Sequence, residues 1–132
     1  MKANELRIGN HIEYYMEDSQ DERQKWWEMD IVDAETILHF QTFPEDADYR
    51  PIKITAEIAF KLGLECLGKK REWYDIEINK RLFISININS GAVAFSFDYY
   101  NWITMDEYKI LYVHQFENLY FTFMNKELVF NL

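Results

Sequence analysis

The chain has 132 residues, which is long enough for one domain with a hydrophobic core and short for two domains of ordinary size. Hydrophobic residues make up 48% and aromatic residues 17%, a composition typical of a folded globular protein with many rings in its core. The formal net charge of −9 makes direct binding to nucleic acid unexpected, because an acidic surface repels phosphate backbones.

The sequence also predicts a compartment. No apolar run of about 18 residues occurs, so we expect no membrane-spanning segment. No apolar stretch follows the basic residues Lys2 and Arg7, so we expect no secretory signal. The single cysteine, Cys66, cannot form an intrachain disulfide, which is typical of proteins in a reducing environment. We therefore expect a cytoplasmic protein.

Residues 1–50 are predicted to form a small β-rich half. An extended lead-in precedes a first strand over residues 11–16, and a second strand is indicated over residues 27–31. In that second strand Trp27, Met29 and Ile31 alternate with Glu28 and Asp30, the pattern of a half-buried strand. A third strand is predicted over residues 36–43. These short strands resemble the start of a small SH3-like barrel, an analogy of fold that carries no function.

The following segment is predicted to contain a short helix and a β-meander. Thr55 is the expected N-cap of the helix, and Gly63 is its expected end. Three runs of alternating apolar residues predict an antiparallel meander, because turn residues separate them. The runs cover residues 74–78, 82–88 and 93–97. The segment 101–110 is predicted to be a connector that leads to the C-terminal helix.

The C-terminal residues predict one strongly apolar helix. Its stripe follows the helical spacing and consists of Tyr112, Phe116, Leu119, Tyr120 and Phe123. Asn125 is expected to end this helix in the left-handed conformation, and residues 128–130 to add a short closing strand.

The expected fold class is therefore α+β. The elements predict a single domain over residues 1–132, with a β half at about 1–50 and an α+β half at about 51–132. An acidic loop over residues 44–49 is expected between the halves. The apolar face of the meander is expected to pack against the stripe of the C-terminal helix, since neither surface is stable in water.

A search of the sequence for reactive groups finds no established catalytic or metal-binding pattern. The three histidines lie far apart, and none has a second histidine or a cysteine at the spacing of zinc ligands. Cys66 and His114 can be considered as a nucleophile and its base, but a lone cysteine between leucines is more often a small core residue. We expect no enzyme activity, no cofactor and no metal.

Two surfaces are candidates for binding a partner. The first is acidic, since residues 1–50 hold thirteen acidic and five basic side chains. Its candidate residues lie in two loops and are Glu17, Asp18, Asp21, Glu22, Glu45, Asp46 and Asp48. A purely solvated acidic face is the alternative interpretation. The second candidate is the polar side of the last helix, with His114, Asn118 and Phe121, which we expect to be structural rather than a contact site. We expect His114 and Asn118 to form hydrogen bonds with a neighbouring strand or loop, and Phe121 to fill a gap beneath it.

Several short motifs resemble an uncharacterised family of small proteins from phages, prophages and mobile elements of gut-type bacteria. The motifs lie at residues 4–10 (NELRIGN), 51–55 (PIKIT), 62–64 (LGL) and 112–121 (YVHQFENLYF). After the last motif this family usually has Thr-Gly before Glu-Glu-Leu, whereas here residues 124–128 are MNKEL. Residues 17–48 have no counterpart in the resemblance. It implies a small cytoplasmic protein in a mobile-element setting and brings no known activity or catalytic residue.

Three functions are compatible with these observations. The first is a non-catalytic interaction protein that binds a basic protein surface, such as an inhibitor of a host nucleic-acid-handling defence complex of the anti-CRISPR type. The second is an accessory protein of assembly that self-associates through its aromatic residues. The third is a small ligand-binding domain or an enzyme of unknown chemistry, which the missing motifs disfavour.

Overall fold

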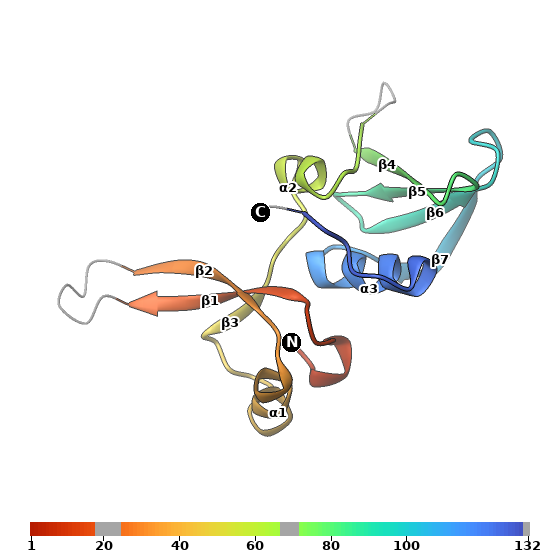
Figure 1. Cartoon of the computed structure of the whole chain (residues 1–132). Coiled ribbons are helices and arrows are strands. Elements are labelled where there is room, and N and C mark those ends of the chain that lie inside the picture. Colours follow the sequence, from red (N-terminus) through yellow and green to blue (C-terminus); the bar gives the residue numbers. More distant parts are fainter. Residues whose placement is uncertain (18–24, 67–71, 131–132) are drawn as a thin grey trace. The chain divides into compact units, whose positions relative to one another are not determined.

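The computed structural model describes residues 1–17, 25–66 and 72–130 (Figure 1). The fold class is mixed α+β, as predicted, with three α-helices and two antiparallel sheets in this part of the chain. The chain forms two compact units. The N-terminal unit comprises Met1–Ile52 and Tyr112–Asn118, and the C-terminal unit comprises Lys53–Leu111 and Leu119–Leu132. A stretch from near the end of the sequence thus belongs to the N-terminal unit.

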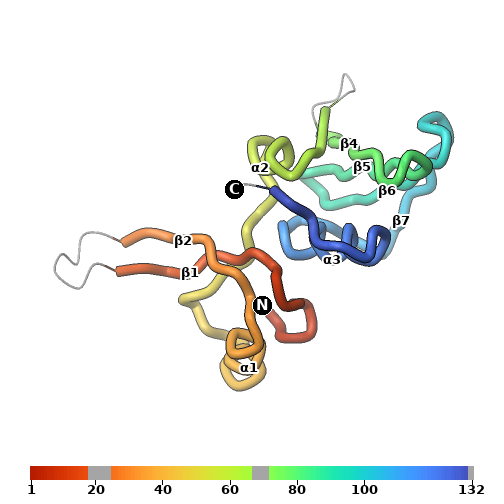
Figure 2. The backbone as a smooth tube through the Cα atoms, viewed as in Figure 1, coloured from red at the N-terminus to blue at the C-terminus, as the bar shows by residue number. Residues whose placement is uncertain are grey.

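The N-terminal unit contains a three-stranded antiparallel sheet in the order β2-β1-β3. Its strands are β1 (His11–Glu17), β2 (Lys25–Ile31) and β3 (Tyr49–Pro51). The strands β1 and β2 lie side by side over their whole length, from His11 opposite Ile31 to Glu17 opposite Lys25 (Figure 2). The expected SH3-like barrel is wrong, because the three strands form an open sheet that does not close on itself.

The third predicted strand is wrong as well, since α1 (Ala34–Thr42) is a helix. A capping box starts it: the Asp33 carboxylate accepts the Thr36 amide at 2.8 Å, and the Thr36 hydroxyl accepts the Asp33 amide at 3.4 Å. Phe40 lies one turn after Thr36, and both are buried. Phe40 joins Leu6, Ile12 and Val32 in one hydrophobic cluster, so α1 covers the sheet face that carries Ile12.

Two further expectations for this unit need correction. The lead-in is not extended throughout, because η1 (Ala3–Glu5) is a 3-10 helix in which the Leu6 amide donates to the Ala3 carbonyl. The strand β2 is present, but Met29 and Ile31 are 45% and 56% exposed rather than half-buried. Their side chains lie on the sheet face opposite Ile12, because successive residues of a strand alternate between its faces.

The C-terminal unit contains α2 (Ala56–Lys61) and a four-stranded antiparallel sheet. The strands, in the order β4-β5-β6-β7, are β4 (Trp73–Ile78), β5 (Leu82–Asn87), β6 (Ala92–Ser96) and β7 (Ile103–Lys109). The predicted meander is therefore confirmed. The predicted connector is wrong, because β7 pairs with β6 along the sheet. All seven residues of β7 are exposed, so this strand lacks the alternation by which strands are recognised.

The predicted ends of α2 are confirmed. The Thr55 side chain accepts a hydrogen bond from the Ile58 amide at 3.3 Å, and Gly63 follows the helix at a φ of +87°. In the meander, the Asp75 carboxylate accepts hydrogen bonds from the Ser85 hydroxyl at 2.5 Å and the Tyr99 hydroxyl at 2.7 Å. This network joins β4, β5 and the turn after β6, and its hydrogen bond to Asp75 raises the pKa of Tyr99 to about 12.

The predicted C-terminal helix is confirmed as α3 (Val113–Met124), and Asn125 follows it at a φ of +52°. Phe116 is fully buried, whereas Phe123 is 44% exposed and contacts the ring of Phe95 on β6 at 5.7 Å. The closing strand expected over residues 128–130 is absent; this segment is irregular, and Val129 is 94% exposed. None of the helices in the described ranges has the length and apolar character needed to cross a membrane.

Candidate partner-binding surface

Residues from both predicted acidic loops meet in the N-terminal unit. Glu17, at the end of β1, and Asp48, just before β3, line one hollow of about 370 Å³ together with Tyr14, Tyr15 and Met16. The Tyr15 amide donates to the Asp48 carbonyl at 2.7 Å, which fixes this loop against β1. Glu17 also forms an ion pair with Lys25 at 3.3 Å, with both side chains about half-exposed. The hollow therefore combines carboxylates with tyrosines.

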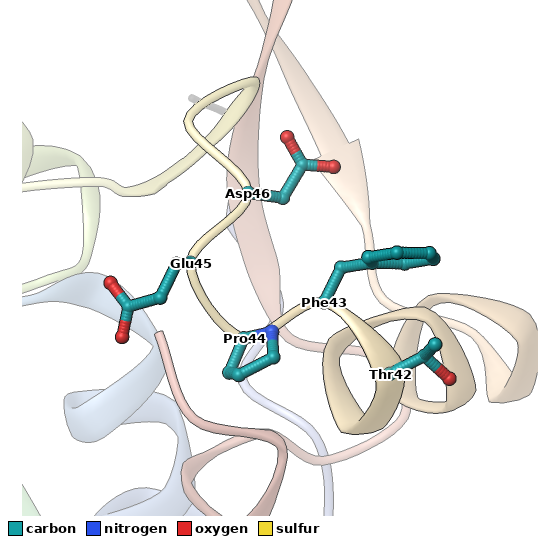
Figure 3. Close-up of a pocket in the computed structure, with 5 residues that line it drawn as sticks. All are labelled: Thr42, Phe43, Pro44, Glu45 and Asp46. Atoms are coloured by element: carbon teal, nitrogen blue, oxygen red, sulfur yellow. The ribbon is translucent and has the colours of Figure 1, made fainter.

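The other two loop residues in the described part of the chain, Glu45 and Asp46, belong to a second hollow. It measures about 400 Å³ and is lined by Thr42, Phe43, Pro44, Glu45 and Asp46 (Figure 3). The carboxylates of Glu45 and Asp46 point to opposite sides of the loop (Figure 3). The loop thus does not gather its two charges into one site. The candidates Asp18, Asp21 and Glu22 lie outside the described residues.

Asp46 has a structural role in this loop. Its carboxylate accepts the Asp48 amide at 2.9 Å and contacts the His39 Nε2 at 2.6 Å. The hydrogen bond from the Asp48 amide, followed by that from His39, holds the pKa of Asp46 below its usual range. Since both oxygens have partners within the unit, Asp46 organises the loop between α1 and β3.

A third acidic hollow was not foreseen from the sequence. It measures about 420 Å³ and is lined by Asp30, Asp33, Glu35, Thr36, His39 and Tyr49. Tyr49 is half-buried there, and burial, together with the charge of Asp30, raises its pKa. This site could not be predicted with residues 36–43 as a strand, because the helix α1 is what brings its residues together. A helix capped by Asp33 places Glu35 in its first turn, next to the end of β2.

The sheet face opposite α1 carries a mixed aromatic and charged cluster. Arg50 on β3 lies over the ring of Trp27 at 4.0 Å and pairs with Glu13 on β1 at 2.5 Å between Nε and Oε2. The ring of Tyr15 contacts Trp27 with a centroid distance of 5.2 Å. These contacts hold Trp27 in place beside the exposed Met29.

The polar side of α3 is structural at Asn118, as predicted. The Asn118 amide oxygen accepts hydrogen bonds from Asn10 Nδ2 at 3.0 Å and Arg7 Nε at 3.3 Å, and its Nδ2 donates to the Glu5 carbonyl at 3.0 Å. The side chain therefore fixes the first ten residues against α3 within the N-terminal unit.

His114 does not form the predicted hydrogen bond. It is 1% exposed, and neither ring nitrogen has a hydrogen-bond partner among the described residues. The ring stacks on Tyr112 at 6.0 Å and 10°. Burial lowers its pKa to about 4, although the nearby Glu5 charge opposes this shift. Phe121 is half-buried. Cys66, which was considered as a nucleophile with His114 as its base, belongs to the C-terminal unit.

One polar contact of α3 was missed in the sequence. Glu117 is 2% exposed and accepts the His11 amide at 2.8 Å through Oε1, while its Oε2 lies 2.8 Å from the His11 Nδ1. No local pattern relates His11 to Glu117, because they are far apart in the chain. In residues 1–17, 25–66 and 72–130, no three His, Cys, Asp or Glu side chains form a group that can hold a metal ion.

Comparisons of this chain with protein-family models, with curated proteins and with solved structures found no match.

Proposed function

We propose that this protein is a non-catalytic interaction protein whose acidic N-terminal unit binds a basic surface of a partner protein. The observation that supports this most is the hollow in which Glu17 and Asp48 stand beside Tyr14 and Tyr15. Carboxylates pair with lysine and arginine, and the ring of Tyr15, on the same face of β1 as Glu17, is of a kind that attracts the same cations. Such a hollow suits a basic side chain better than a phosphate, a sugar or a neutral ligand.

The process in which such a protein acts is inferred from charge and from the resemblance to mobile-element proteins. A protein of net charge −9 has the sign needed to occupy a basic groove that otherwise holds a phosphate backbone. We therefore propose an inhibitor of a host defence complex that handles nucleic acid, acting in the cytoplasm. The electrostatic attraction acts mainly on the association rate and on the choice of partner.

A second candidate function is self-association through β7. This strand is the last of its sheet, all seven of its residues are exposed, and Ile103 and Met105 are 65% and 44% exposed. An exposed apolar edge strand is a common site of pairing between chains. Sedimentation velocity tests it: a concentration-dependent dimer that Ile103→Lys converts to a monomer supports it, and a monomer at all concentrations excludes it.

The proposed function is tested by capture from a bacterial extract on three immobilised proteins. These are the wild type, E17Q/D48N and the control E57Q/E77Q, which removes two exposed charges from the C-terminal unit. We expect the wild type and the control to retain the same basic protein and E17Q/D48N to lose it. Equal retention by all three proteins contradicts a role for the hollow.

A further inference from the structure

The strand β2 has one side without a partner strand in the described part of the chain, since it is the first strand of the order β2-β1-β3. The hydrogen-bond register shows which of its backbone groups face outward. The Val32 amide donates to the Asn10 carbonyl at 2.8 Å, and bonded pairs alternate along an antiparallel ladder. Trp27 and Met29 therefore direct their backbone N–H and C=O groups away from β1.

At the Ile31 end, the outward edge is closed. The Ile31 amide donates to the side chain of its neighbour Asp30 at 2.9 Å, so that amide already has an acceptor. The amides of Trp27 and Met29 lie before this point. An incoming strand can thus pair with β2 over a short stretch centred on these two residues.

The two faces of β2 differ in chemistry. On the face opposite α1, Trp27 is half-buried and Met29 and Ile31 are exposed, so β2 presents apolar side chains there beside the Arg50–Glu13 pair. On the other face lie the carboxylates of Glu28 and Asp30 and the partly exposed Trp26, whose indole Nε1 donates to the Glu28 carboxylate at 2.9 Å. Because cross-strand neighbours share a face, a strand added to β2 meets apolar and acidic side chains in alternation.

The acidic side of β2 continues into a hollow. Asp30 lines the hollow of about 420 Å³ with Asp33 and Glu35, and none of the described residues that line it is a lysine or an arginine. A long basic side chain entering beside Asp30 therefore meets three carboxylates. The negative charge of the hollow is complementary to a basic side chain, so it favours a basic segment as the occupant of the β2 edge.

We propose that the outer edge of β2 binds an extended segment of the partner protein in which basic and apolar residues alternate. Its backbone pairs with Trp27 and Met29, its basic side chains lie beside Glu28 and Asp30, and its apolar side chains cover Met29. The inference rests on the proposed function and specifies how the basic partner is recognised. A second copy of this chain fits worse, because antiparallel pairing about Met29 places Glu28 opposite Asp30 of the other copy.

The experiment uses defined peptides and the full-length protein. The probe is a fluorescent eight-residue peptide of alternating lysine and valine. One control peptide has four lysines followed by four valines. The other has the alternating sequence with N-methyl groups on the valine amides, which face β2 when the valines lie opposite Trp27 and Met29. We expect fluorescence anisotropy to show about 10-fold tighter binding of the alternating peptide than of either control, because only it supplies both the pattern and the backbone donors.

Protein variants test the edge itself. M29P removes an outward amide while leaving the ladder to β1 intact, and M29V keeps that amide. We expect M29P to weaken binding of the alternating peptide about 10-fold and M29V to change it less than about 2-fold, because strand addition depends on main-chain hydrogen bonds. E28Q/D30N should weaken binding mainly at low salt. If M29P does not fold, the N-methylated peptide still tests the backbone hydrogen bonds, because it is measured with the wild-type protein.

The outcomes separate this inference from the proposed function. Equal binding of the alternating and block peptides, or no binding of either, overturns the inference. Loss of binding in E28Q/D30N with full binding by M29P also overturns it, since charge alone then explains the affinity. A dimer of the wild type that M29P dissociates assigns the edge to a second copy and overturns it too. The proposed function fails by a different result, namely unchanged partner capture by E17Q/D48N.

Discussion

Two neighbouring polar residues on α3 show opposite ways of burying a side chain. Asn118 has hydrogen-bond partners at both ends of its amide. His114 has none among the described residues, although it is 1% exposed. A buried polar group without partners opposes folding, since it loses its hydrogen bonds to water. The sequence predicted that both are structural, but the partners of Asn118 lie in residues 5–10, which no helical periodicity relates to α3.

Replacing His114 by Leu should leave the free energy of unfolding at pH 7 unchanged or raise it, because the variant removes two buried nitrogens without partners. The variant should also remove a pH dependence. In the unfolded chain the histidine binds a proton below about pH 6.5, whereas in the folded protein its pKa is about 4. The unfolded state therefore binds more protons in this window, and folding loses stability as the pH falls.

The expected loss in the wild type between pH 6.5 and pH 4 is about 3 kcal/mol from this residue. Urea titrations of the wild type and His114→Leu at a series of pH values measure the difference between the two curves. If the two curves run parallel across this window, the His114 ring is not buried in its neutral form.

At the scale of single elements, caps and turns decide the structure where hydrophobic patterns are ambiguous. Residues 36–43 contain apolar residues at several spacings, so a strand and a helix are both compatible with them. The capping box between Asp33 and Thr36 selects the helix. By contrast, the meander was predictable because its alternation is strict, and β7 was not because none of its side chains is buried.

Thr36→Val tests the capping box directly. The variant keeps the shape of a buried side chain and removes the hydroxyl that donates to Asp33 at 2.9 Å. We expect a loss of about 1 kcal/mol in the free energy of unfolding. The matched control, Thr42→Val at the exposed end of α1, should cost less than about 0.5 kcal/mol. Equal costs at both sites in denaturant titrations show that the cap does not determine this helix.

The turn between β5 and β6 depends on a glycine with no room for a side chain. Gly91 has a φ of +77°, and an added Cβ would lie 2.8 Å from the Leu111 Cγ and 3.2 Å from the Ile110 carbonyl oxygen. Gly63 has a similar φ of +87°, but its nearest contact would be the Ile76 Cδ1 at 3.8 Å. Both backbone conformations are unfavourable for alanine, and only Gly91 adds a steric clash.

We therefore expect Gly91→Ala to cost about 2–4 kcal/mol of unfolding free energy and Gly63→Ala about 1–2 kcal/mol. Thermal unfolding of both variants, followed by circular dichroism, measures the difference. A smaller loss at Gly91 than at Gly63 contradicts the close approach of Leu111.

Over the whole molecule, charge is unevenly distributed along the chain. Residues 1–50 have a net charge of −8 from thirteen acidic and five basic residues, whereas residues 51–132 have ten acidic and nine basic residues. This asymmetry in charge is evident from the sequence alone. It did not distinguish the structural carboxylates Asp33 and Asp46 from Glu17 and Asp48, which line an open hollow. Nor did any local pattern assign residues 112–118 to the N-terminal unit.

The most direct test of the proposed acidic binding surface is the association rate constant with the captured partner, measured by stopped-flow fluorescence at low and high salt. The variant E17Q/E45Q/D48N removes three carboxylates without disturbing Asp46, and the control E57Q/E77Q/E107Q removes three from the C-terminal unit. We expect the variant to associate about 10-fold more slowly than the control at low salt, since charge attraction accelerates encounter. At high salt the two rates should converge, because the screening length falls to about 3 Å at 1 M. Equal rates for the two proteins at low salt contradict the proposal and identify the acidic residues as a solvated surface.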